Sequence, residues 1–302
     1  MKIFVGMLAI VAVCGFVVAA EPSSDRPKWK KVLPATPDTL TEHRGLTCAK
    51  HGDRAVLLDL YVPKAEGPFP AILLIHGGGW RHGQVEADKP LAERLASHGY
   101  VVGQVAYRLS GEAKYPAALD DCKAAVRWMR AHAAQYKIEP ERFGVMGGSA
   151  GGHLSGLLAM TSDKSEFEGK RGSDEQSSAV KACVIMAASA DLVAANREKT
   201  NEAALQFFGS SCQENPQLYA SASPITHVGP NSPPTLFIEG QLDTPKAGSP
   251  EMREKLKQYG VFTELVTLKD APHPFWMSQP WLDETVACAV PFLDRFLKDK
   301  NR

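Results

Sequence analysis

The 302-residue sequence predicts an α/β fold, in which a doubly wound, mostly parallel sheet carries helices on both faces. Three observations predict it. Strand-like apolar runs alternate with helical patterns, the run at 70–75 is apolar throughout as a buried parallel strand requires, and a glycine-rich turn at 147–152 joins a strand-like run to a helix-like one. The strand-like runs lie near 55–62, 70–75, 100–106, 142–146, 180–187, 234–239 and 262–268.

Two helical patterns between and after these runs are clear. Residues 117–134 place four apolar side chains at helical spacing, and a final helix at about 280–299 begins near Ser278. The four core-facing residues of the first helix are Leu119, Cys122, Val126 and Met129. Residues 190–230 lack a clear strand, so they form either a lid or substrate wall, or an ordinary excursion from the sheet.

Composition indicates one globular catalytic domain, which we expect at residues 45–302. The chain is 44% hydrophobic and 23% charged, enough for a single large core. Lys plus Arg and Asp plus Glu both number 34, so there is no electrostatic reason to expect a nucleic acid or anionic membrane partner. The sequence shows no metal-ligand spacing, and we expect neither a metal nor another cofactor. It leaves the oligomeric state open.

The N-terminus reads as an export signal at residues 1–20. Lys2 provides a positive start, an apolar stretch follows from Ile3 to Val18, and small residues precede Glu21. We expect cleavage after Ala20 and a secreted or periplasmic protein that is free of the membrane. An uncleaved anchor is the alternative, because the apolar stretch approaches the length that spans a bilayer. Residues 21–44, with several prolines, are expected to form a loose leader.

Cysteine usage does not indicate a disulfide framework. Five cysteines remain after the expected cleavage, an odd number at scattered spacings. Cys122 and Cys183 read as core residues. Cys48 and Cys212 are left as the candidates if a bridge forms.

Ser149 is the candidate nucleophile. It lies in the sequence Gly147-Gly148-Ser149-Ala150-Gly151-Gly152, between a strand-like and a helix-like run. Glycines at 147 and 151 permit a turn tight enough to push the serine oxygen clear of the backbone. The N-terminus of the following helix presents free N–H groups to a developing oxyanion.

A second glycine cluster supports this hypothesis. The apolar run 70–75 ends in His76-Gly77-Gly78-Gly79-Trp80, where backbone N–H groups can approach a substrate oxygen without a Cβ in the way. Acyl transfer needs at least two such donors. We therefore expect Gly78, Gly79 and Ala150 to form an oxyanion hole. A phosphate-binding glycine loop is the alternative, but no G-K-[ST] or GxGxxG spacing follows.

These motifs resemble those of a known family. Together with Asp59-Leu60-Tyr61-Val62-Pro63, Tyr107-Arg108-Leu109-Ser110 and Tyr115-Pro116-Ala117-Ala118, the two glycine clusters are similar to those of α/β-hydrolases. The resemblance is to the hormone-sensitive-lipase and feruloyl/acetyl-xylan-esterase-like (BD-FAE-type) group, and it runs from about residue 45 to the C-terminus. It implies an α/β-hydrolase fold and a carboxylesterase with a Ser/Asp/His triad.

His273 is the candidate base. In this fold the triad follows the order serine, acid, histidine along the chain, and three histidines follow Ser149. His153 lies on the same helix as the serine and reads as structural, while His227 precedes the best acid. His273 follows the strand-like run 262–268, in the loop where the base is expected.

Asp243 is the candidate acid, because it follows the short buried strand 234–239 and can orient His273. Asp191, after the strand at 180–187, is the rival, and Asp270 is a third choice that reads as a turn residue. We also assign Trp80 and Asp191 to substrate binding.

The expected chemistry is hydrolysis of an ester through an acyl-enzyme, without cofactors. By analogy, export suggests an acetyl or feruloyl ester of a polysaccharide, or a small-molecule ester. Three alternatives remain open: a serine exopeptidase of the prolyl-oligopeptidase type, a formamidase, and a non-catalytic hydrolase-like binding module.

Overall fold

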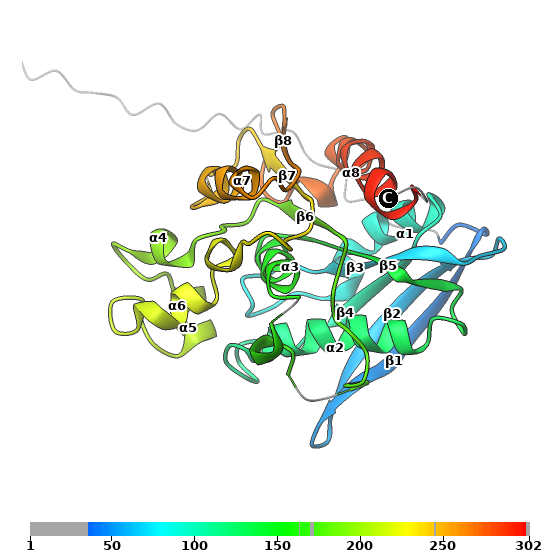
Figure 1. The fold of residues 1–302 in the computed structure, drawn as a ribbon, viewed down its shortest axis with the longest axis horizontal. Coiled ribbons are helices and arrows are strands. Elements are labelled where there is room, and N and C mark those ends of the chain that lie inside the picture. The colour runs from blue at the N-terminus through cyan, green and yellow to red at the C-terminus, as the bar shows by residue number, and fades with distance from the viewer. Residues whose placement is uncertain (1–35, 163, 170–171, 245, 300–302) are drawn as a thin grey trace, which may run out of the picture.

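A computed structural model describes residues 36–162, 164–169, 172–244 and 246–299 (Figure 1). The predicted signal segment, 1–20, and most of the predicted leader lie outside these ranges. Within them, no helix combines the length and the apolar composition needed to cross a membrane.

A mixed sheet of eight strands forms the centre of the described residues, in the order β1-β2-β4-β3-β5-β6-β7-β8. The strands are β1 (Leu40–His51), β2 (Arg54–Pro63), β3 (Phe69–Ile75), β4 (Val101–Ala106), β5 (Ile138–Gly148), β6 (Ala182–Met186), β7 (Thr235–Gly240) and β8 (Thr263–Leu268). The strand β2 runs antiparallel to both of its neighbours, β1 and β4, and the other neighbouring pairs are parallel. Leu73 at the middle of β3 pairs with Gly103 and Val145 on either side. The predicted doubly wound, mostly parallel sheet is confirmed.

Helices cover both faces of this sheet (Figure 1). They are α1 (Lys89–Ser97), α2 (Ala117–Ala131), α3 (Ala150–Met160), α4 (Leu192–Asn196), α5 (Glu202–Phe208), α6 (Pro216–Ser221), α7 (Ser249–Gln258) and α8 (Trp281–Leu297). One core lies beneath α2, α3 and α7, and a second beneath α1 and α8. Alternate residues of one strand feed the two cores: Phe237 enters the first, and Leu236 and Ile238 the second. Leu119, Cys122, Val126 and Met129 are all fully buried, as their helical spacing predicts.

The strand β1 is the one that the sequence pattern missed, and it corrects the leader boundary. The leader was expected to extend to residue 44, but the strand begins at Leu40. Most of β1 is polar and half-buried or exposed because it is an edge strand, so it lacks the apolar alternation that identifies a strand. It folds back on β2 through a two-residue turn at Gly52 and Asp53.

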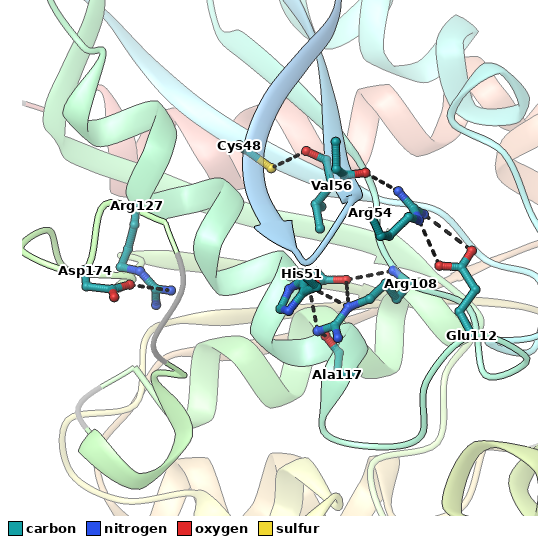
Figure 2. Close-up of polar contacts among 11 residues, drawn as sticks. Cys48, His51, Arg54, Val56, Arg108, Glu112, Ala117, Arg127 and Asp174 are labelled. Carbon is teal, nitrogen blue, oxygen red and sulfur yellow. Dashed lines mark hydrogen bonds and ion pairs between the residues drawn. The ribbon is translucent and has the colours of Figure 1, made fainter.

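Polar contacts fasten this hairpin to the rest of the domain (Figure 2). Nε2 of His51 lies 2.9 Å from the carboxylate of Asp121, a fully buried residue of α2. The guanidinium of Arg108 donates to both oxygens of the same carboxylate, and Arg54 donates to Glu112 at 3.0 Å. A single buried carboxylate thus joins the hairpin, the loop after β4 and α2.

The five cysteines in the described residues are all free thiols. Cys48 lies in β1 and donates to the carbonyl of Val56 at 3.3 Å, whereas Cys212 lies in the loop between α5 and α6 near the carbonyl of Val193. The candidate bridge between Cys48 and Cys212 is therefore wrong: each thiol is buried against a backbone carbonyl of another segment. Cys122 and Cys183 are core residues, as expected.

Candidate active site

Ser149 lies at a sharp turn between β5 and α3. Its φ and ψ are 56° and −122°, a strained combination for a residue with a side chain. Its N–H donates to the carbonyl of Met186 in β6, which holds the turn against the sheet. A Cβ at Gly147 would lie 2.5 Å from the carbonyl oxygen of Gly151, and a Cβ at Gly151 only 1.9 Å from that of Ile75. The two glycines are therefore needed for the turn, which is the geometry expected of a nucleophile elbow.

The glycine loop after β3 faces the same serine. Gly78 has a φ of +111° and Gly79 one of +59°, and a Cβ at Gly78 would lie 1.9 Å from the carbonyl oxygen of His82. Among the residues that the structure describes, the N–H groups of Gly78, Gly79 and Ala150 donate no hydrogen bond. Such unpaired donors at a cavity wall can bind a substrate oxyanion.

His273 and Asp243 meet beyond the ends of β8 and β7. Nδ1 of His273 lies 2.7 Å from Oδ2 of Asp243, although 30 residues separate them. The other oxygen, Oδ1, accepts a hydrogen bond from Nζ of Lys246 at 2.7 Å. Burial raises the pKa of Asp243, because it disfavours the charged carboxylate. The hydrogen bonds from Lys246 and His273 outweigh this effect, so the pKa of Asp243 lies below its ordinary value. The charged acid orients the imidazole, and Lys246 is a partner that the sequence did not indicate.

The other two histidines after the serine have structural partners. Nδ1 of His153 accepts from Nε1 of Trp80 at 3.2 Å, and its Nε2 donates to the carbonyl of Ala222 at 2.7 Å. Burial lowers the pKa of His153 to about 4, so the ring stays neutral. His227 is bonded through Nε2 to the carbonyl of Ser221.

The two residues assigned to substrate binding differ in their surroundings. Trp80 is buried: its ring stacks on Phe207 of α5 at 4.7 Å, and one edge borders a cavity beside Ser149. The carboxylate of Asp191 accepts the N–H of Ala194 at 2.9 Å and so caps α4. Asp270 is a turn residue with a φ of 53°.

Two cavities meet at Ser149. The larger, about 390 Å³, is lined by the glycine loop, His273, Trp276 and Asp88. The smaller, about 180 Å³, is lined by Gly79, Trp80, Ala150 and residues of the 190–230 segment, including Leu192 and Asn196. That segment contains α4, α5 and α6, and it forms one wall of the smaller cavity.

The sequence did not single out Asp88 or Trp276 as site residues. Asp88 is only 3% exposed, and Nε1 of Trp276 donates to its Oδ1 at 3.1 Å. The Trp276 ring packs edge-on against His273, with 5.3 Å between centroids, and fills the space where Gly148 has no side chain. Trp276 stands three residues after His273, a proximity that could have identified it; no local pattern marks Asp88.

Comparison with known proteins gives a consistent result. The BD-FAE family model matches residues 58–256. Esterase LipQ of Mycobacterium tuberculosis is 29% identical over 251 residues, which make up 79% of this chain and 59% of LipQ. Versiconal hemiacetal acetate esterase of Dothistroma septosporum is 29% identical over 231 residues, 72% of this chain and 70% of that protein. The chain spans 48% and 49% of two further mycobacterial relatives, so it corresponds to about half of the length of several proteins that it matches.

A solved structure supports the same relationship. Thermogutta terrifontis esterase 2, phosphonylated by cyclosarin, superimposes with a TM-score of 0.72 at 26% identity, covering 88% of this chain and 98% of that one. The expected α/β-hydrolase fold is thereby confirmed.

Proposed function

The chain belongs to the BD-FAE family, and from this premise we propose that it is a serine carboxylesterase. The observation that carries the proposal is the bond between His273 and Asp243 beside a cavity that also contains Ser149. LipQ and versiconal hemiacetal acetate esterase are named as esterases, which supports the same activity here.

In the proposed mechanism, neutral His273 takes the proton of Ser149 as the serine oxygen attacks the ester carbonyl. Asp243 keeps the imidazole in the tautomer with Nδ1 protonated and stabilises the imidazolium that forms, because its carboxylate accepts from Nδ1. The N–H groups of Gly78, Gly79 and Ala150 stabilise the oxyanion. His273 then protonates the leaving alcohol. In the second half of the reaction, water gives a proton to His273 and attacks the acyl-enzyme, and His273 returns the proton to Ser149 as the carboxylic acid leaves.

In this proposal the alcohol and the acyl group of the ester occupy different cavities. The leaving oxygen must lie within reach of His273, which lines only the larger of the two cavities. The alcohol therefore occupies the larger cavity, and the acyl group points away from it into the smaller one. At about 180 Å³ the smaller cavity lies below the ~300–1,000 Å³ typical of pockets for drug-sized ligands, which favours acetyl over feruloyl.

We further propose that the protein is exported and acts on an acetylated polysaccharide or a fragment of one. The N-terminal segment, with Lys2 followed by an apolar stretch and small residues before Glu21, supports export. Extracellular polymers are the substrates that an exported esterase meets. The name of the Dothistroma relative specifies an acetate ester, which supports the choice of acyl group.

Turnover of p-nitrophenyl acetate, set against a dipeptidyl p-nitroanilide, tests the proposal. We expect the acetate to be hydrolysed and the anilide not. Ser149→Ala should fold normally, and its kcat should fall by a factor of about 10³–10⁶ because the nucleophile is gone. The residual rate comes from substrate binding and the oxyanion donors, which remain. Preferential cleavage of the anilide would indicate a peptidase. A Ser149→Ala protein that keeps more than a tenth of the wild-type rate would exclude Ser149 as the nucleophile.

A further inference from the structure

The larger cavity contains a carboxyl group that the proposed mechanism does not use. Asp88 ends a short 3-10 turn, Val85–Asp88, directly before α1. The residue is 3% exposed, yet it lines the same cavity as Ser149 and His273. It is the one carboxylate among the described residues that line this cavity.

Asp88 has few partners for a buried acid. Nε1 of Trp276 donates to Oδ1, and within the described parts of the chain the carboxyl makes no other hydrogen bond or ion pair. No lysine or arginine lines the cavity in those parts. The neighbouring Lys89 directs its ammonium to Glu42 at 3.0 Å instead. One oxygen of the acid therefore has no protein partner.

A structural role in holding Trp276 does not explain why a carboxyl group, rather than a neutral side chain, is buried at position 88. A buried carboxylate without a cation loses its hydration, and this desolvation raises the pKa of Asp88 to about 7. If the group only held Trp276 in place, a neutral amide would accept the same indole N–H without that cost. Unpaired polar groups in a cavity are typical of sites where a ligand provides the missing partner.

We propose that Oδ2 of Asp88 binds hydroxyl groups of the leaving alcohol, and that it selects polyhydroxylated alcohols, such as a sugar, over alkyl alcohols. The inference rests on the proposed function, because it places the alcohol in the larger cavity. Carboxylate oxygens accept strong hydrogen bonds from hydroxyls. An alkyl alcohol leaves Asp88 unpaired, and a site with an unpaired buried polar group rejects the ligand that fails to satisfy it.

The other lining residues fit the same ligand. Trp276 presents an aromatic ring to the cavity, and Gln84 and His82 add polar groups to its wall. An aromatic surface together with hydrogen-bonding side chains suits a sugar ring, which has apolar C–H faces and hydroxyl edges. A cavity intended for an alkyl chain would not need Asp88.

A matched pair of acetate esters tests this inference. Methyl glucopyranoside 6-acetate and cyclohexylmethyl acetate share a six-membered ring and a primary acetate ester, and the sugar ester adds three hydroxyl groups, a ring oxygen and a methoxy group. The quantity measured is the ratio of kcat/KM for the sugar ester to kcat/KM for the cyclohexyl ester. We expect the wild-type ratio to exceed 1. Asp88→Leu, which removes the acceptor, should lower it by about 10- to 100-fold.

Two further variants keep the test decisive. Asp88→Asn retains an acceptor for the indole of Trp276 but loses the charge, so the ratio should fall by about tenfold, even if Asp88→Leu does not fold. Asp120→Asn is the matched control, because Asp120 is a partly buried carboxyl whose pKa is raised by burial to about 6 and which lines a different cavity. It should leave the ratio unchanged.

The outcomes separate this inference from the proposed function. A wild-type protein that hydrolyses p-nitrophenyl acetate but prefers the cyclohexyl ester would overturn the inference alone. So would Asp88 variants that slow both esters equally, because that result indicates a role in positioning Trp276. A wild-type protein inert towards p-nitrophenyl acetate would contradict the proposed function, and the inference with it.

Discussion

Two carboxyl groups near His273 have opposite environments, and only Asp88 lines the larger cavity. Asp243 lies behind His273 and receives hydrogen bonds from that imidazole and from Lys246, so its pKa is lowered despite burial. Asp88 lies in the cavity wall with one indole N–H as its partner, and desolvation raises its pKa to about 7. Burial raises the pKa of both acids, but Asp88 is the more deeply buried and only Asp243 has charged and hydrogen-bonding partners that reverse the effect.

The difference also separates two roles. A carboxyl that stays ionised can stabilise an imidazolium during each proton transfer. A buried carboxylate with few hydrogen-bond partners, such as Asp88, destabilises the folded protein until a ligand pairs with it. Divergent pKa values of neighbouring acids are a general sign of divided roles in an active site.

The largest expected effect comes from neutralising Asp243. Asp243→Asn keeps the size of the side chain but favours the wrong tautomer of His273, so kcat should fall by about 10⁴. Steady-state kinetics with p-nitrophenyl acetate measures it. Asp191→Asn is the control, because the Asp191 carboxylate caps α4, and its kcat should stay within a few-fold of the wild type. If Asp191→Asn proves the crippling change, the acid has been misassigned.

Asp88→Asn should instead change stability, in a manner that depends on pH. The unfolded carboxyl has an ordinary pKa near 4 and the folded one a pKa of about 7. Between these values the folded state holds a proton that the unfolded state has lost, so wild-type stability falls as pH rises through this window. The amide does not titrate, and its advantage at pH 8 should be roughly 3 kcal/mol greater than at pH 4.

Melting temperatures of the two proteins at pH 4, 5, 6, 7 and 8 check this prediction. The difference in melting temperature between Asp88→Asn and the wild type should grow steadily from pH 5 to pH 7 and more slowly between pH 7 and pH 8. An equal difference at every pH would mean that Asp88 does not titrate in this window, and that its surroundings compensate its charge.

The smallest effect is expected at Lys246, whose ammonium is paired with Asp243 at 2.7 Å. Lys246→Met removes a hydrogen bond that lowers the pKa of Asp243, so this pKa should rise towards its ordinary value. Loss of the ammonium also removes a positive charge beside the Asp243–His273 pair, so the pair is protonated more easily. The acidic limb of the kcat/KM profile, which follows protonation of this pair, should move to higher pH by about one unit or less, with less than a tenfold loss of kcat at pH 8.

Lys255→Met is the matched control for this change, because Nζ of Lys255 donates to the carbonyl of Ile225 and not to a carboxylate. Its profile should overlay that of the wild type. A Lys246→Met profile that also overlays it would mean that His273 and the N–H of Thr244 maintain the charge of Asp243 without the lysine.

The sequence predicted those parts of the site that depend on local backbone geometry. The turn at Ser149 and the loop at Gly78 and Gly79 need glycine at fixed spacings, which a single sequence displays. Chain order then selected His273, and the structure brings it to Asp243. Strands with apolar runs were equally visible, whereas β1 was not, because an edge strand needs no apolar alternation.

Asp88 could not be found in this way. Its burial depends on Trp276, which lies 188 residues further along the chain. No residue near Asp88 in the sequence indicates its contact with Trp276. The burial of Trp80 against Phe207 is likewise a tertiary effect, produced by α5, a helix that the pattern of residues 190–230 did not resolve. Pairing across such distances is set by packing rather than by local preference.

Labelling with a fluorophosphonate tests the central claim, that Ser149 is the nucleophile activated by His273. Peptide mass spectrometry of the labelled protein should find the adduct on the peptide containing Ser149, with loss of esterase activity in proportion to labelling. Ser149→Ala should not be labelled at this peptide, and His273→Ala should be labelled far more slowly. An adduct on a different residue that abolishes activity, or full activity in a protein labelled at Ser149, would contradict the account.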